Sequence, residues 1–196
     1  VNPSLPAEAR PQRVTIRSVE DWWGLRSLWE IPQPPEGGIP RDRYRLRIFD
    51  NDTELEPLDL ATSCLIFGAT LRHAHVADSS DGVKGQHVAL VFQPPDAWSL
   101  EAINGYCLLS SALQYEPVVG ALRAEGREDA FESEKTMKVS IGGDPQLLST
   151  RLNCFCLGRS NVVFFLDDTH IGSEQAPAKR PKLADVAVAA PAQVPL

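Results

Sequence analysis

Residues 41–49 read RDRYRLRIF, a stretch in which apolar and charged side chains alternate strictly from Arg43 onward. Tyr44, Leu46 and Ile48 fall on one side of an extended chain, and the intervening arginines fall on the other. A period of two is typical of a β-strand with one buried face, because successive side chains point to opposite faces of a sheet. The stretch therefore predicts a strand that turns its apolar face toward a core.

Short apolar runs separated by turn-forming residues extend this pattern along the chain. They are RVTIRSV (13–19), ATSCLIFGATLRHAHV (61–76), HVALVF (87–92), PVVGALRA (117–124), TMKVSIGG (136–143), LLSTRLNCFCLG (147–158) and SNVVFFLDD (160–168). There is no strand–helix–strand alternation and no internal repeat. The pattern predicts a mainly β protein, an antiparallel β-sandwich or jelly roll, with one or two short inserted helices.

Two segments predict those helices. In residues 18–30, Ser18 and Asp21 form a helix-start signal, and Trp22, Leu25 and Trp29 follow at helical spacing. In residues 96–106, an aspartate after two prolines is suited to cap a helix. Residues 107–115 fit either a helix or a strand.

Length and composition indicate one domain with short extensions. The chain has 196 residues, of which 43% are hydrophobic, and a net charge of −7. We expect an extended lead over residues 1–11, a β-rich domain over 12–172 and a Pro/Ala-rich tail over 173–196. No segment approaches the ~20 apolar residues of a membrane span. Four cysteines are too few for a disulfide scaffold, and we expect them to be reduced core residues.

Arg41, Arg43, Arg45 and Arg47 would line one face of one strand, with like charges every ~7 Å. Such a row needs negative charge opposite it. One interpretation is a solvated face that meets Asp and Glu of a neighbouring strand. The other is contact with a nucleic-acid backbone or with an acidic patch of another subunit, because arginine binds carboxylate and phosphate in a bidentate manner.

Motifs for catalysis are missing from the sequence. It has no GxSxG, HExxH, GxxxxGK[ST] or GxGxxG pattern, so we expect no enzyme, no catalytic residues and no cofactor. His73, His75 and His87 are the histidines that a zinc site would use, but no cysteine or carboxylate joins them at a recognisable spacing. We therefore expect no metal site and no small-molecule substrate.

Two further groups of residues point to partners. Trp22, Trp23 and Trp29 are candidates for a subunit interface, because tryptophan is enriched at interface hot spots, although core packing explains them as well. Lys179, Arg180 and Lys182 resemble a short nuclear-import signal.

Residues 88–98 (VALVFQPPDAW) and 99–109 (SLEAINGYCLL) read as an apolar strand, a proline break, a short helix and a Gly-x-Cys apolar run. This order resembles the middle of jelly-roll coat proteins of small positive-strand RNA viruses. The resemblance implies a capsid subunit that assembles in many copies around single-stranded RNA, located in the virion or the host cytoplasm. The chain departs from many such coats because it lacks an Arg/Lys-rich arm, so the arginines near Arg41–Arg47 would neutralise the genome.

Two other hypotheses stay open beside the coat protein. One is a nuclear protein-interaction module, imported through its basic tail and binding a partner on its sheet surface. The other is a small hydrolase or zinc protein that uses the three histidines.

Overall fold

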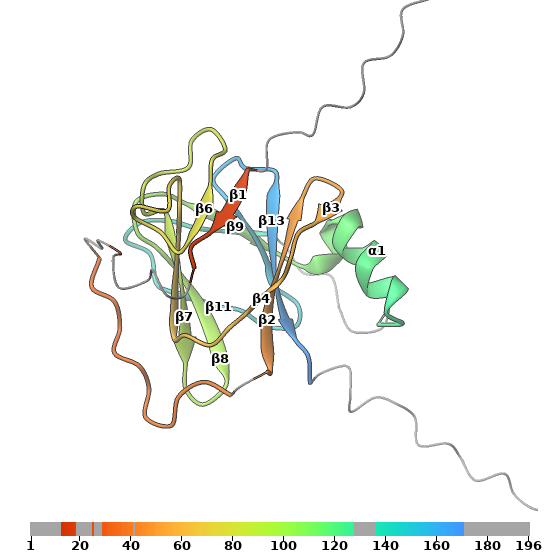
Figure 1. Ribbon diagram of the computed structural model, residues 1–196, viewed down its shortest axis with the longest axis horizontal. Coiled ribbons are helices and arrows are strands. Elements are labelled where there is room, and N and C mark those ends of the chain that lie inside the picture. The colour runs from red at the N-terminus through yellow and green to blue at the C-terminus, as the bar shows by residue number, and fades with distance from the viewer. Residues whose placement is uncertain (1–12, 19–24, 26–28, 41, 128–135, 171–196) are drawn as a thin grey trace, which may run out of the picture.

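Two β-sheets pack face to face in the computed structural model (Figure 1). The structure describes residues 13–18, 25, 29–40, 42–127 and 136–170. The predicted lead over 1–11 and tail over 173–196 lie outside these residues, as does nearly all of the helix expected at 18–30.

The first sheet has six strands. Their spatial order is β1 (Val14–Ile16), β6 (Val76–Asp78), β5 (Cys64–Gly68), β7 (Val88–Gln93), β8 (Ala97–Ala102) and β11 (Gln146–Leu147). The strands pair in antiparallel fashion except for β5 and β6, which are parallel.

The second sheet has seven strands. Their order is β10 (Met137–Val139), β9 (Cys107–Ser110), β12 (Cys154–Leu157), β13 (Val162–Asp168), β2 (Tyr44–Asp50) and β3 (Thr53–Glu54), and β4 (Leu58–Asp59) also pairs with β2. All of these pairings are antiparallel. The predicted β-sandwich is thus confirmed.

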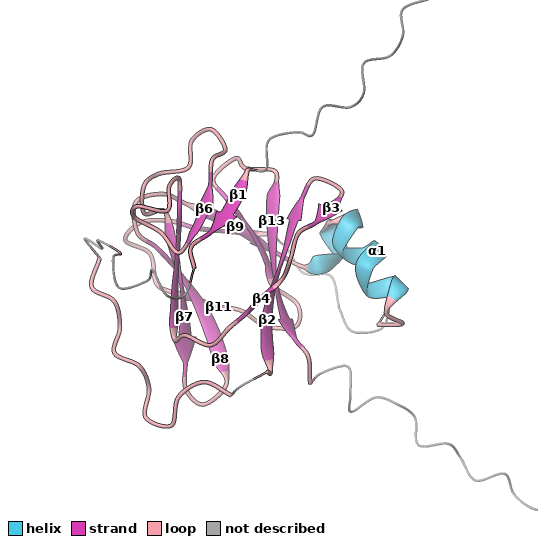
Figure 2. Cartoon of the chain, in the orientation of Figure 1, coloured by secondary structure: helices cyan, strands magenta, loops and turns pink. Residues whose placement is uncertain are grey.

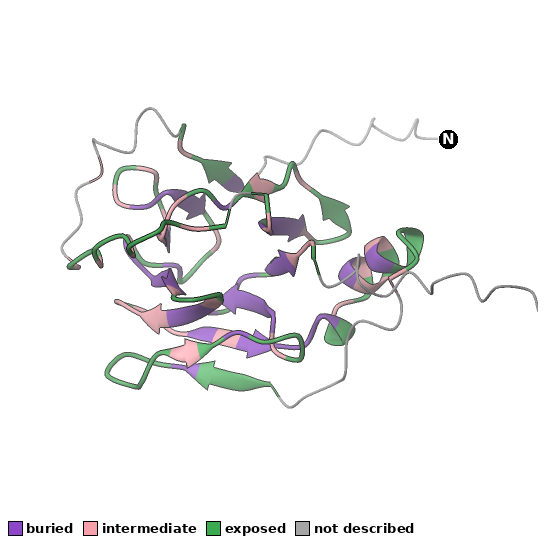
Figure 3. Cartoon of the chain, turned by 90° about the horizontal axis from the view of Figure 1, so that it is seen from below, coloured by how far each residue is buried: buried purple, intermediate pink, exposed green. Residues whose placement is uncertain are grey.

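The main core lies between the sheets, and β2 contributes to it as its alternation predicts. Tyr44, Leu46 and Ile48 are buried in that core. Aromatic rings pack against one another between the two sheets. The ring centre of Phe67 in the six-stranded sheet lies 5.2 Å from the ring centre of Phe155 in the seven-stranded sheet. Figure 3 shows the buried residues gathered on the strands, whereas most loops are intermediate or exposed.

A helix covers the outer face of the seven-stranded sheet. It is α1 (Glu116–Ala124), preceded by a 3-10 turn over Ala112–Gln114, and it lies beside β2 and β13 in Figures 1 and 2. Pro117 lies in the first turn, where its missing N–H has no cost. Val118 and Leu122, four residues apart, are buried against Phe165 of β13 in a second apolar cluster.

One helix and one strand predicted from the sequence are wrong. Residues 97–102 form strand β8 instead of a helix, because they pair with β7 along their whole length. Residues 117–124, predicted as a strand, lie in α1. Residues 107–115 divide into β9 and the 3-10 turn. Neither helix of the described residues is long and apolar enough to span a membrane.

The four cysteines are free and buried, as expected, and they occupy three different layers. Cys107 lies in the main core, and Cys154 and Cys156 lie beneath α1. Cys64 belongs to a third apolar cluster on the outer face of the six-stranded sheet. Burial raises the pKa of Cys64 and of Cys107 to about 12.

His75 binds the backbone of Ile66 in β5 through both its ring and its backbone. Its ring Nδ1 accepts a hydrogen bond from the Ile66 backbone N–H at 2.9 Å, and its backbone N–H donates to the Ile66 carbonyl at 2.8 Å. The residue is only 5% exposed. Burial, assisted by the charge of Arg17, lowers the pKa of His75 to about 4.

The depressed pKa of His75 predicts a specific loss of stability in acid. An unfolded histidine titrates near pH ~6.5, so the unfolded state binds a proton that the folded state refuses until about pH 4. Stability falls as the pH drops through this window, by roughly 2–3 kcal/mol at about pH 4.5. His75→Gln keeps an acceptor for Ile66 but does not titrate. Urea unfolding at several pH values should show a flatter profile for this variant, and parallel profiles would exclude His75 as the cause.

Candidate functional site

The described arginines of the predicted row, Arg43, Arg45 and Arg47, all bind carboxylates within the chain. Arg43 hydrogen-bonds Asp168 through two nitrogens, at 2.9 and 3.2 Å from its Oδ2. The Arg45 Nε lies 2.9 Å from an oxygen of Asp59 in β4. Arg47 is bound by several acids at once, as described below, and Arg41 lies outside the described residues. The acidic neighbours of these three arginines come from within the fold.

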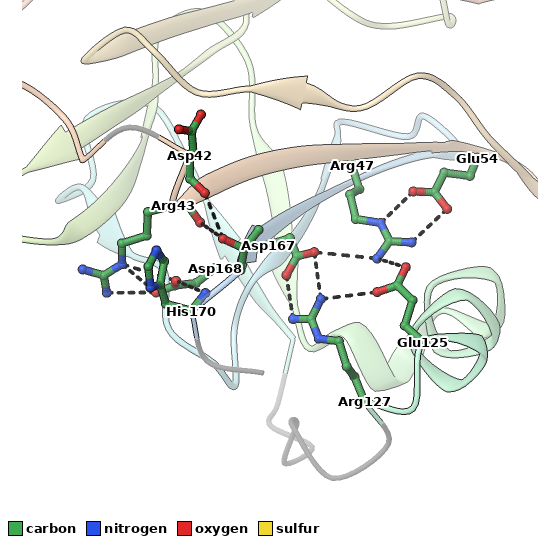
Figure 4. Close-up of polar contacts among 10 residues, drawn as sticks. Asp42, Arg43, Arg47, Glu54, Glu125, Arg127, Asp167, Asp168 and His170 are labelled. Atoms are coloured by element: carbon green, nitrogen blue, oxygen red, sulfur yellow. Dashed lines mark hydrogen bonds and ion pairs between the residues drawn. The ribbon is translucent and has the colours of Figure 1, made fainter. Parts of the chain in front are cut away.

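Arg47 lies at the centre of an arginine–carboxylate cluster, made of Arg47, Glu54, Glu125, Arg127 and Asp167 (Figure 4). Arg47 donates to both oxygens of Glu54, at 2.6 and 2.9 Å, and lies 2.9 Å from Glu125. Arg127 binds Asp167 in a bidentate manner, at 2.7 and 3.0 Å. Asp167 also lies 3.7 Å from Arg47, so it joins the two guanidinium groups.

The cluster is centred on two buried residues and holds one more negative charge than positive charge. Arg47 is 5% exposed and Asp167 is 4% exposed. Burial disfavours the charged form of Arg47, but Glu54, Glu125 and Asp167 outweigh it and raise the pKa of the guanidinium. Hydrogen bonding to Asp167 raises the pKa of Arg127. Two cations therefore meet three anions, which ties α1 to the sheet and leaves no surplus positive charge for a phosphate.

A second arrangement of polar residues lies at the end of the sandwich that is uppermost in Figure 1. We call it the loop end, because the loops after β5, β6 and β8 and the turns after β2 and β12 meet there. His87 fastens two of its loops together. The Lys84 N–H donates to His87 Nδ1 at 2.9 Å, and His87 Nε2 lies 2.8 Å from the Tyr106 carbonyl oxygen.

These two bonds define the tautomer of His87, because Nδ1 accepts a hydrogen bond and Nε2 therefore carries the proton and donates one. Burial lowers the pKa of His87, which keeps this neutral form. Gly105 packs directly on the ring, and a Cβ there would overlap it. The loop end is thus held in one shape before any ligand arrives.

A polar pocket opens between these loops, and we call it the loop-end pocket. It has a volume of about 430 Å³ and is lined by Arg13, Ser79, Ser80, Asp81, Arg159, Ser160 and Asn161. Ser160 donates a hydrogen bond to the Ser80 hydroxyl at 3.0 Å. Arg13 is paired with Asp50 at 3.0 Å, whereas no carboxylate within the described residues pairs with Arg159.

The loop-end pocket is not predicted by the sequence analysis. Arg13 precedes β1, Ser79 and Ser80 follow β6, and Arg159 and Ser160 lie in the turn between β12 and β13. No local pattern joins these segments, since only the sheet pairing brings them to the same end. The arrangement of guanidinium and hydroxyl donors is suited to hold an acidic group.

The candidate histidines do not form a metal site. The Nδ1 atoms of His75 and His87 both accept backbone N–H groups, so these lone pairs are engaged. Among residues 13–18, 25, 29–40, 42–127 and 136–170, no group of three potential ligands is placed to hold a metal ion.

Of the candidate interface tryptophans, only Trp29 lies in the described part of the chain. Its indole Nε1 donates to Glu101 at 3.2 Å, and its ring packs on the apolar cluster outside the six-stranded sheet. A role at a subunit interface stays a prediction. Trp22, Trp23 and the basic residues Lys179, Arg180 and Lys182 lie outside the described residues.

No protein-family model matches the chain, and no curated protein matches it either. Among solved structures, the chain is similar to the FHA domain of the CT664 protein from Chlamydia trachomatis, with 17% identity and a TM-score of 0.41 over 65% of this chain and 98% of that one. It is also similar to the FHA domain of TbPar42, with 14% identity and a TM-score of 0.35 over 85% of this chain and 88% of that one.

These similar structures contradict the predicted resemblance to viral coat proteins. The structures that the chain resembles are FHA domains and not coat jelly rolls, so the coat-protein resemblance is wrong. The capsid function, the assembly in many copies and the RNA partner were inferred from that resemblance and are wrong as well. The fold agrees with the correction, because the stretch that carried the resemblance contains no helix and because β5 and β6 run parallel.

The arginine–carboxylate cluster predicts a contrast between two arginines of the same strand face. Arg47→Met removes a buried guanidinium that binds Glu54, Glu125 and Asp167, and it should lower the free energy of unfolding by about 2 kcal/mol through the loss of charge-assisted hydrogen bonds. Arg45→Met removes an ion pair whose side chains are 45% and 65% exposed, and should cost less than about 1 kcal/mol. Urea denaturation of both variants tests this. Equal losses of unfolding free energy in the two variants would mean that the burial of Arg47 does not determine how much it stabilises the fold.

Proposed function

We propose that this chain is a protein-interaction module that binds an acidic or phosphorylated segment of a partner protein in its loop-end pocket. One observation carries the proposal. Two arginines and three serines from three distant segments converge on one polar pocket, and one of those arginines, Arg159, pairs with no acid among the described residues. The proposal gives the chain a binding role and no catalytic one.

The chemistry of the pocket supports an anionic ligand group. Guanidinium groups bind carboxylate and phosphate through paired N–H donors, and serine hydroxyls add further donors. Asp81 also lines the pocket, and Asp50 already binds Arg13, so Arg159 is the guanidinium of the lining that no acid within the described residues binds. We therefore assign the main ligand contact to Arg159.

The position of the pocket supports a protein as the partner. Binding residues are concentrated on loops that a rigid scaffold positions. Here His87 and Gly105 hold the neighbouring loops in place, so less conformational freedom is lost when a partner binds. The pocket is open to solvent and is shaped by several loops, which suits an extended segment of polypeptide.

Arg159→Ala should weaken the binding of such a segment by about tenfold or more, because it removes a charge-assisted contact. The measurement uses the full chain and a degenerate peptide library centred on phosphoserine or phosphothreonine. Fluorescence polarisation gives affinities, and ¹⁵N–¹H spectra locate the shifts.

Arg123→Ala is the matched control, since Arg123 is an exposed arginine on α1, away from the loop end. It should bind as the unaltered chain does. The proposal fails if no phosphorylated or acidic peptide shifts residues 79–81 and 159–161, or if Arg159→Ala binds with unchanged affinity.

We further propose that Lys179, Arg180 and Lys182 direct the module to the nucleus. Replacing all three with alanine in a fusion too large for passive diffusion should lower the nuclear-to-cytoplasmic ratio of fluorescence by about threefold or more. Alanine at Arg72, Arg123 and Lys138 removes the same charge from the described part of the chain and should leave the ratio unchanged. An unchanged ratio in the tail variant would remove the import role.

A further inference from the structure

The loop-end pocket contains an aspartate as well as arginines, and this aspartate restricts what the pocket can bind. Asp81 lies in the loop between β6 and β7, and Arg159 lies in the turn between β12 and β13. Both residues are exposed, and both line the pocket. Two separate segments therefore present one anion and one cation to a ligand in the same pocket.

A hydrogen bond between the two segments keeps these charges close together. Asp81 directly follows Ser80 in its loop. Arg159 directly precedes Ser160, whose hydroxyl donates to the Ser80 hydroxyl at 3.0 Å. The Ser160 Oγ also accepts a hydrogen bond from the Val162 N–H at 3.0 Å, which fixes it to the start of β13. The chain beneath the two charges is thus held in place, whereas the charged residues themselves are exposed to solvent.

Neither of the two charges is compensated within the described part of the chain. Among those residues, no cation pairs with Asp81, no carboxylate pairs with Arg159, and the two do not pair with each other. Arg13 of the same lining differs, because it lies 3.0 Å from a carboxylate oxygen of Asp50. Opposite charges that line one pocket without pairing leave space for a ligand that pairs with both.

Asp81 works against a ligand that carries negative charge alone. An acidic or phosphorylated residue that binds Arg159 comes close to the Asp81 carboxylate, and like charges repel. A lysine or arginine beside that ligand residue would pair with Asp81 and replace the repulsion by attraction. Charge complementarity of this kind contributes to specificity more than to affinity.

The size of the pocket limits how far apart the two charges of the ligand lie. The pocket has a volume of about 430 Å³. An extended segment advances about 3.3 Å per residue, so a residue one or two positions from the anionic one begins within about 7 Å of it. A residue three positions away begins about 10 Å away, which exceeds the width of a compact pocket of this volume.

We propose that the loop-end pocket selects a segment that carries both charges: an acidic or phosphorylated residue that binds Arg159, and a lysine or arginine one or two positions away that binds Asp81. This inference rests on the proposed function and names the class of partner segment that the pocket prefers. Segments that carry only negative charge are poor ligands, although an arginine provides the main contact.

The degenerate phosphopeptide library tests the preference with the full chain. Peptides retained by the chain should be enriched in Lys and Arg over Asp and Glu within two positions of the phosphorylated residue. The tightest binder is then synthesised with lysine, glutamine or glutamate at each of those positions in turn. At one of them the lysine peptide should bind about threefold more tightly than the glutamine peptide, and the glutamate peptide should bind most weakly.

Asp81→Asn removes the carboxylate and keeps a side chain of the same size. In this variant the advantage of the lysine peptide over the glutamine peptide should fall below about 1.5-fold, because its partner is gone. Asp144→Asn is the matched control, since Asp144 is an exposed aspartate outside the lining of the pocket. It removes the same charge, so a lysine advantage that came only from the net charge of −7 would fall equally in both variants.

Two results would overturn this inference and leave the proposed function in place. One is equal affinity of the lysine and glutamate peptides at every position. The other is a lysine advantage that survives in Asp81→Asn or falls equally in Asp144→Asn. In both cases Arg159→Ala would still weaken phosphopeptide binding. If no library peptide binds the chain, the proposed function fails, and this inference fails with it.

Discussion

A guanidinium group that leaves water must be met by carboxylates, and the outer face of the seven-stranded sheet is arranged around this constraint. The alternation of β2 places Arg47 on that face, and α1 then covers it. Once Arg47 is buried, it has to be surrounded by acids from several elements. Glu54 comes from β3, Glu125 follows α1, and Asp167 comes from β13, so one arginine fixes where three elements end relative to one another. Arg127, through Asp167, extends the same constraint to the end of the sandwich where β2 begins and β13 ends.

The two ends of the sandwich are consequently different in character. The end where β2 begins and β13 ends is tied to the charged cluster and holds a small cavity that opens to solvent. The loop end is held by a neutral histidine and opens a polar pocket. The arginine row is readable in the sequence because its pattern is local, but its acidic partners are not, since they come from elements far along the chain. Arg13 and Arg159 are likewise brought together only by the sheet order, so no motif predicts the pocket.

The secondary structure is predictable from the sequence where the apolar residues follow one period, that of a strand or that of a helix. It is not predictable where a segment fits both periods. Residues 96–106 carry a capping Asp96, which favours a helix, but Trp98 and Leu100 also alternate, and pairing with β7 decides for the strand. Residues 117–124 contain β-branched valines, which favour a strand. Val118 and Leu122 nevertheless lie four residues apart after a first-turn proline, and the apolar surface of β13 beneath them decides for the helix. In both segments the neighbouring sheet, which local sequence does not contain, selects the outcome.

The distribution of the cysteines has a consequence for how the opening of this molecule can be followed. Alkylation requires a thiolate at the surface, and burial withholds both the charge and the access. A thiol can therefore react only during a local opening of the layer that contains it. Because Cys64 lies on one outer face, Cys107 between the sheets and Cys154 beneath α1, the rate of modification at each position reports a different layer. The unaltered chain thus allows the order in which its layers come apart to be timed without any introduced label.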